Sequence, residues 1–172
     1  GFVKLFMDGV LDSGTAFRLD RDDAGPLFSD ADFARIATEI DRRGLQIAVH
    51  AIGDGAVRQT LNGFAAARAA NGARDSRHRI EHIEMITRED VPRLIDLGVT
   101  ASLQPSHAPG AMDFDLDSTL AILGPERYAD AFQCRTLTDA GAPLCFASDW
   151  PVSDVSVFRS LKAAMTRPIF PG

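Results

Sequence analysis

The chain has 172 residues, a length that favours one domain, and its 45% hydrophobic and 24% charged residues are typical of a globular fold. A formal net charge of −6 without a basic stripe argues against nucleic acid as a partner. No apolar run approaches the roughly 20 residues that span a bilayer, so we expect no membrane segment and favour a cytoplasmic location.

The chain begins at Gly1, not Met, and enters a strand-like run almost at once. We therefore expect residues 1–172 to form a single incomplete domain from a longer chain.

Apolar strand-like runs alternate with helix-like segments along the whole chain. We expect strands at 2–7, 46–51, 79–84, 100–104 and 143–148, and helices at about 30–43, 54–70, 87–97, 125–140 and 154–166. A long loop is expected at 106–118. Ser29 and Asp32 resemble a capping box for the first helix, and Asp54 is expected to be the N-cap of the second.

The near-continuous apolar strands predict an α/β fold with a parallel sheet that is buried on both faces. An open doubly wound sheet and a partial (β/α)8 barrel both fit this order. Four of the five strand-like runs end in ligand-type residues, and a barrel uses the ends of many strands for its site, so we favour the barrel. A complete barrel needs about 250 residues, so five βα units form only part of one.

The ligand-type residues are Lys4, His50, His82 and Asp149, which occupy similar positions in successive units. In a parallel barrel these positions converge on the catalytic face, and the residue types suit a metal pair. Each residue alone also has a structural explanation: a lysine on a frayed first strand, two hydrogen-bonded core histidines and a loop-capping aspartate.

Three other residues carry separate expectations. His107, in the loop after the fourth strand, is expected to contact substrate, with a solvated loop histidine as the alternative. His78 lies at the opposite end of the third strand and is expected to be structural. Cys145 lies within an apolar run and is expected to be a buried, reduced thiol.

Several segments resemble the metal-dependent amidohydrolase superfamily, nearest to the branch that contains N-substituted formamide deformylase. They are VKLFMDGVLDSGTA, VHAIGDGAV, RHRIEHIE, SLQPSHA and LGPERYADAFQCRTLTDAGAPLCFASDWPV. The resemblance implies a TIM barrel, with the five units here corresponding to strands four to eight. It also implies a binuclear site, usually of zinc.

In that pattern Lys4 is the carboxylated lysine that bridges two metals, and His50 and His82 are metal ligands. Asp149 is both a metal ligand and the catalytic proton shuttle. The family also uses a His-x-His pair at strand one, and this sequence contains no His-x-His. The resemblance therefore implies two metals in the complete enzyme and none or one in this chain.

The implied function is hydrolysis of a non-peptide C–N bond, of the amide or formamide type, in a small-molecule substrate by a metal-activated hydroxide. As an isolated piece the chain is expected to be inactive. Three alternatives stay open. They are an esterase or phosphotriesterase with the same metals, a metal-binding module without turnover, and a non-catalytic half-barrel that self-associates through its open edge.

Overall fold

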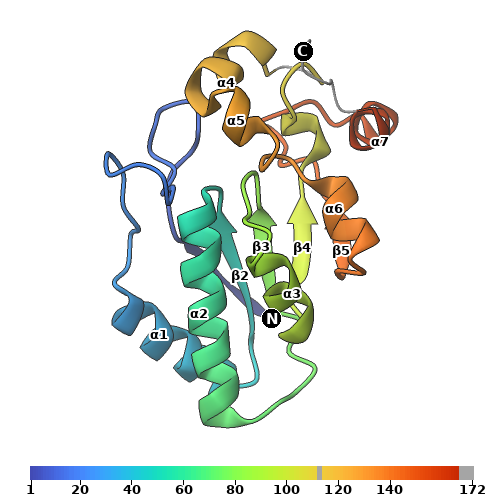
Figure 1. Ribbon diagram of the computed structural model, residues 1–172. Helices are drawn as coiled ribbons and strands as arrows, with labels where there is room; N and C mark the ends of the chain where they lie inside the picture. Colours follow the sequence, from blue (N-terminus) through green and yellow to red (C-terminus); the bar gives the residue numbers. More distant parts are fainter. Residues whose placement is uncertain (112–113, 167–172) are drawn as a thin grey trace.

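The computed structural model describes residues 1–111 and 114–166, which form a five-stranded parallel sheet with helices between the strands (Figure 1). The strands are β1 (Phe2–Phe6), β2 (Gln46–Ala51), β3 (Arg79–His82), β4 (Thr100–Leu103) and β5 (Leu144–Phe146). The helices are α1 (Asp30–Arg42), α2 (Asp54–Asn71), α3 (Asp90–Asp96), α4 (Leu116–Leu123), α5 (Pro125–Tyr128), α6 (Cys134–Asp139), α7 (Val157–Met165) and the 3-10 helix η1 (Pro105–His107). None of the helices in these ranges is long and apolar enough to cross a membrane.

The strands pair in chain order, β1-β2-β3-β4-β5, so the predicted α/β fold and parallel sheet are confirmed. Phe6 pairs with His50, and Ala51 pairs with His82. Because all strands run the same way, their carboxyl ends meet at one edge of the sheet. This edge is the end at which α4 and α5 lie (Figure 1).

Helix α1 begins as the sequence predicts. The Ser29 hydroxyl accepts a hydrogen bond from the Asp32 backbone N–H at 3.1 Å and donates one to the Asp32 carboxylate at 2.8 Å. The buried face of the helix carries Phe33, whose ring packs against α2 at Gly63. A Cβ atom added at Gly63 would lie 2.3 Å from that ring, so the close contact between α1 and α2 requires glycine.

The main core lies between the sheet and helices α1, α2 and α3, which cover one face of the sheet (Figure 1). The prediction that both faces of every strand are buried is wrong at the two edge strands. In β1 exposed residues alternate with half-buried ones, and in β5 both Cys145 and Phe146 are exposed. Cys145 is thus not a core thiol, because it is exposed on this edge strand.

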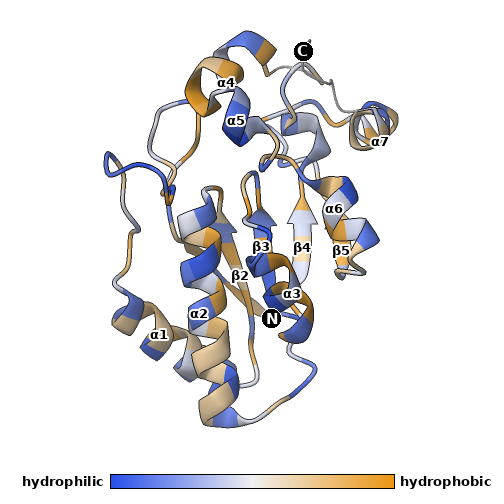
Figure 2. Cartoon of the chain, viewed as in Figure 1, coloured by the Kyte–Doolittle hydropathy of each residue, from blue (hydrophilic) through white to orange (hydrophobic). Residues whose placement is uncertain are grey.

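A second core lies beneath α4 and α5, where the sequence predicted a loop and the start of a longer helix. Helix α4 begins after Asp115, whose carboxylate accepts the Ser118 backbone N–H at 2.8 Å. The helix is largely apolar (Figure 2), and its Leu123 packs in one cluster with Leu11 and Met85. The predicted helix at 125–140 is divided into α5 and α6. The α4–α5 segment therefore forms a cap over the carboxyl ends of the strands.

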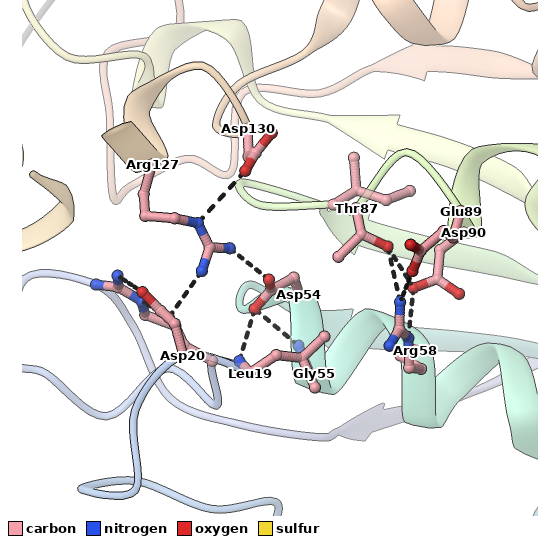
Figure 3. Close-up of polar contacts among 12 residues, drawn as sticks. Leu19, Asp20, Asp54, Gly55, Arg58, Thr87, Glu89, Asp90, Arg127 and Asp130 are labelled. Atoms are coloured by element: carbon pink, nitrogen blue, oxygen red, sulfur yellow. Dashed lines mark hydrogen bonds and ion pairs between the residues drawn. The ribbon is translucent and has the colours of Figure 1, made fainter. Parts of the chain in front are cut away.

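An ion-pair network fastens this cap to α2 (Figure 3). Arg127 of α5 pairs with Asp54 at the start of α2, with Asp20 at 2.9 Å and with Asp130 at 3.4 Å. Gly53 is the N-cap of α2, so the prediction of Asp54 as N-cap is wrong by one residue. The Asp54 carboxylate instead accepts two backbone N–H groups and the Arg127 guanidinium, which joins the helix start to the cap.

Candidate functional site

A cavity of about 460 Å³ opens at the carboxyl ends of the strands, beneath the α4–α5 cap. The five residues singled out from the sequence all line it: Lys4, His50, His82, His107 and Asp149. The convergence expected from their positions is therefore present. It follows from the parallel order of the strands, which brings residues 145 positions apart to one cavity.

Three histidine rings lie in a row along one wall of the cavity. The ring centroids of His50 and His82 are 4.5 Å apart, and those of His82 and His107 are 5.7 Å apart with nearly parallel planes. Burial lowers the pKa of His82 to about 2, and nearby His50, His107 and Lys4 add to this shift. His82 is therefore neutral at physiological pH, which is the form that binds metal ions.

The backbone is strained on both sides of the cavity. His82 and the following Ile83 have φ angles of 77° and 47°, and Asp149 has a φ angle of 55°. Non-glycine residues rarely occupy this left-handed region, which costs about 1–3 kcal/mol each and is concentrated at functional sites. These left-handed residues change the direction of the chain at or just after the carboxyl ends of β3 and β5, where the candidate ligands lie.

His82, His107 and Asp149 form a compact group of potential ligands. One ligand atom from each lies within 4.8 Å of the others. His82 Nδ1 and His107 Nε2 are buried and have no hydrogen-bond partner among the described residues. A buried imidazole nitrogen without a partner is unfavourable by about 1–3 kcal/mol, and a divalent cation would relieve this. The residues present thus fit a metal ion of the kind the fold family implies.

Lys4 lies in the middle of β1 and lines the same cavity. The side chain is exposed, and its Nζ lies 5.4 Å from the centre of the Phe6 ring. Partial desolvation lowers the pKa of Lys4, and the negative charges of Glu81 and Asp149 oppose the shift. A lowered pKa increases the fraction of neutral amine, the reactive form of lysine.

Asp8 is a buried carboxylate beside the site that the sequence analysis missed. It accepts hydrogen bonds from three backbone N–H groups: Phe17 at 3.0 Å, Ile52 at 3.0 Å and Gly53 at 2.8 Å. Burial raises its pKa, and these three N–H groups oppose the shift. Asp8 therefore ties the loop after β1 to the end of β2. The sequence signal that could have revealed Asp8 is its position two residues after the end of β1, the strand that also carries Lys4.

The same loop fixes the orientation of His50. His50 Nε2 lies 2.8 Å from the Gly9 carbonyl oxygen and 3.7 Å from an Asp8 carboxylate oxygen. A carbonyl oxygen only accepts hydrogen bonds, so Nε2 carries the proton in the neutral ring. His50 Nδ1 is consequently the nitrogen left unprotonated.

Glu84 is a second residue that the sequence analysis gave no role. Its side chain is 12% exposed, and its Oε1 lies 3.6 Å from His107 Nδ1. Burial raises the pKa of Glu84, and His107 opposes the shift. The signal was the strand expected at 79–84, in which alternation places His82 and Glu84 on one face, although β3 itself ends at His82.

His78 lies at the opposite end of the sheet, as expected. Its Nδ1 accepts the Ile47 backbone N–H at 3.1 Å, and its Nε2 lies 3.0 Å from the Asp41 carboxylate. Both ring nitrogens are thus occupied by protein partners, which confirms the structural role predicted from its position.

Comparisons with known proteins agree with this geometry. The sequence model described as "Amidohydrolase family" matches residues 1–170. The protein LONG AFTER FAR-RED 3 of Arabidopsis thaliana is 34% identical, over 97% of this chain and 29% of its own length. The N-substituted formamide deformylase of Arthrobacter pascens is 24% identical, over 100% of this chain and 32% of its own length.

A solved structure of an uncharacterized metal-dependent hydrolase from Pyrococcus horikoshii OT3 superposes with a TM-score of 0.81 and 26% identity, covering 96% of this chain and 33% of that one. This likeness supports the predicted partial barrel. The chain spans about a third of the length of each of these relatives. Membership is shown at the level of the family, and the formamide deformylase branch stays a prediction. The chain belongs to the amidohydrolase family.

Proposed function

We propose that this chain is part of the catalytic barrel of a metal-dependent hydrolase, in which Lys4, His50, His82 and Asp149 hold the metal centre. The observation that carries the proposal is the unpartnered, buried nitrogen of neutral His82, which lies in one cavity with the other three residues. Among the described residues no hydrogen bond gives His82 Nδ1 a structural role, whereas His78 has partners on both ring nitrogens.

A divalent metal at this site would polarise a scissile carbonyl and supply a nucleophile from water at neutral pH. The side chains of this chain would bind the metal, supply negative charge and transfer the proton. Asp149 lies at the mouth with its side chain 41% exposed, where a carboxylate can take a proton and return it to a leaving nitrogen. Neutral Lys4 can capture carbon dioxide, and the resulting carbamate provides a negative charge facing the cavity. His50 would bind through Nδ1, because Nε2–H donates to Gly9.

We propose a small-molecule substrate with a non-peptide C–N bond, of the amide or formamide type. A cavity of about 460 Å³ falls within the range of small-molecule sites. Its wall includes Leu11, Phe114 and Phe132, which suit an apolar N-substituent. The name of the formamide deformylase relative supports this bond type. Esters and phosphotriesters are the alternative substrates, because the same chemistry cleaves them.

Zinc is the metal we propose, since neutral imidazoles and a carboxylate suit it. The family's His-x-His pair has no counterpart among the four histidines of this chain. We therefore propose that the complete enzyme holds two metals and that the isolated chain binds at most one, without turnover.

The test compares zinc binding by the wild-type 172-residue chain with zinc binding by two matched variants, His82→Asn and His78→Asn. Calorimetry and metal analysis measure the zinc bound by each. In His78→Asn the amide oxygen can still accept the Ile47 N–H, so the fold and the site should both survive. We expect wild type and His78→Asn to bind up to one zinc per chain and His82→Asn to lose it. Equal zinc content in wild type and His82→Asn would contradict the ligand assignment.

A second proposal, self-association through the open barrel edge, is favoured by the exposed aromatic residues of the edge strands. Phe2 and Phe6 of β1 are 54% and 53% exposed, and Phe146 of β5 is 41% exposed. Large exposed apolar groups on an edge strand favour pairing with a second chain. Analytical ultracentrifugation should show a dimer that Phe2→Lys weakens and Leu27→Lys, a change at a 65% exposed residue outside the sheet, leaves intact. A monomer at all concentrations would exclude it.

A further inference from the structure

We propose that His107 is a metal ligand of this chain, completing a cation site with His82 and Asp149, and that Glu84 is the positioning residue for His107. The inference deepens the proposed function and rests on it. The ligand set implied by the family resemblance assigns His107 no metal contact, so this residue would be an additional ligand.

The first support is the geometry of the three ligand atoms. His107 Nε2 lies 3.9 Å from Asp149 Oδ2, and the whole group fits within 4.8 Å. Ligand atoms around a tetrahedral zinc with bonds of about 2.0–2.1 Å lie about 3.4 Å apart. The distance from His107 to Asp149 thus needs to shorten by roughly 0.5 Å, which the partly exposed Asp149 side chain can provide by rotation.

The second support is the state of the His107 ring. The residue is 5% exposed, and its Nε2 is buried with no hydrogen-bond partner in the described part of the chain. A solvated loop histidine would instead be exposed, with its ring nitrogens hydrogen-bonded to water. The 3.9 Å separation from Asp149 is too long for a hydrogen bond, so that carboxylate does not satisfy Nε2.

The third support is Glu84, which faces the other ring nitrogen at 3.6 Å. A carboxylate beside Nδ1 favours the tautomer with the proton on Nδ1 and leaves the Nε2 lone pair free. The same arrangement of carboxylate, histidine and metal recurs in protein zinc sites, where it orients the ligand. No hydrogen-bond donor among the described residues bonds to the Nε2 lone pair, so it stays available to a cation.

The fourth support is a buried link between the loops that carry His107 and Asp149. The Ser153 and Ser106 hydroxyl groups are joined by a hydrogen bond of 2.8 Å, and both residues are at most 4% exposed. Ser106 directly precedes His107 within η1. The link holds the two loops together independently of any metal, so the ligand pair is preorganised.

The test uses cobalt(II), whose visible absorption reports the number and kind of its ligands, on the 172-residue chain. Wild type, His107→Asn, Glu84→Gln, His82→Asn and the control His78→Asn are titrated with cobalt after circular dichroism confirms their folding. We expect an affinity loss of about 100-fold or more for His107→Asn with altered absorption bands, and about 10-fold for Glu84→Gln. His78→Asn should match wild type.

A measurement on the unmutated chain covers the case in which His107→Asn fails to fold. Two-bond ¹H–¹⁵N correlation spectra of histidine should show the His107 Nε2 signal moving to the range of a metal-bound nitrogen when zinc is added. An unmoved signal, or unchanged affinity and bands in His107→Asn while His82→Asn loses binding, would overturn the inference and leave the proposed function intact. Absence of binding by wild type would overturn both.

Discussion

The cap over the cavity should depend on Arg127, and Arg127→Met tests this quantitatively. The change removes the guanidinium but keeps most of the aliphatic stem. Removing one partner of a fully buried ion pair costs about 3–5 kcal/mol. Here Arg127 is 20% exposed, Asp54 is 1% exposed, and Asp54 keeps two backbone N–H donors at a helix start. We therefore expect a smaller loss in the free energy of unfolding, about 2 kcal/mol.

The control is Arg135→Met, which removes an arginine that is 87% exposed and 3.9 Å from Asp139. Its expected loss is within about 0.5 kcal/mol. For a chain of this size, 2 kcal/mol corresponds to a fall of about 4–8 °C in Tm. Thermal and urea unfolding followed by circular dichroism measure both variants. Equal stability of the two variants would refute the role of Arg127 in fastening α5 to α2.

Two further predictions concern packing and pH. Gly63→Ala should lower stability by about 1–3 kcal/mol, because the added methyl group meets the buried Phe33 ring. Gly25→Ala, where no atom of the described residues lies within 4 Å of the added methyl group, should show no such loss in urea unfolding. Burial lowers the pKa of His82 to about 2 and lowers that of His78, where Asp41 opposes the shift. Both histidines take up protons in the unfolded chain near pH 6.5, so their contribution to stability is complete above pH 6.5 and declines as pH falls toward the folded-state pKa. Between pH 7.5 and 5.5 His82 should contribute a loss of about 1 kcal/mol in the free energy of unfolding, and His78 should contribute a loss of the same sign. An unchanged pH dependence in His82→Asn would contradict this.

The sheet and the convergence of the site could be predicted from the sequence because both depend on local patterns. Apolar runs that carry Lys4, His50 and His82 give the strand positions, and a parallel order alone brings the carboxyl ends of these strands together. The Ser29 cap of α1 is likewise a short-range signal.

The cap and the ion pairs that fasten it to α2 could not be predicted in the same way. Arg127 contacts Asp54 and Asp20, which lie 73 and 107 positions earlier in the chain, so local pattern does not reveal the network. Phe132, with a φ angle of 49°, separates α5 from α6, and its sequence context shows no glycine or proline to indicate a break. Cys145 lies in an apolar run, but burial depends on neighbours that the run itself does not specify.

The central claim is that the carboxyl ends of the strands form a metal site. Crystals of the chain grown with zinc and measured at the zinc absorption edge test it most directly. The account predicts an anomalous peak in the strand-end cavity, about 2.0–2.2 Å from a nitrogen of His82 and an oxygen of Asp149. A peak only at His78 and Asp41, or no anomalous peak in crystals grown with excess zinc, would contradict it.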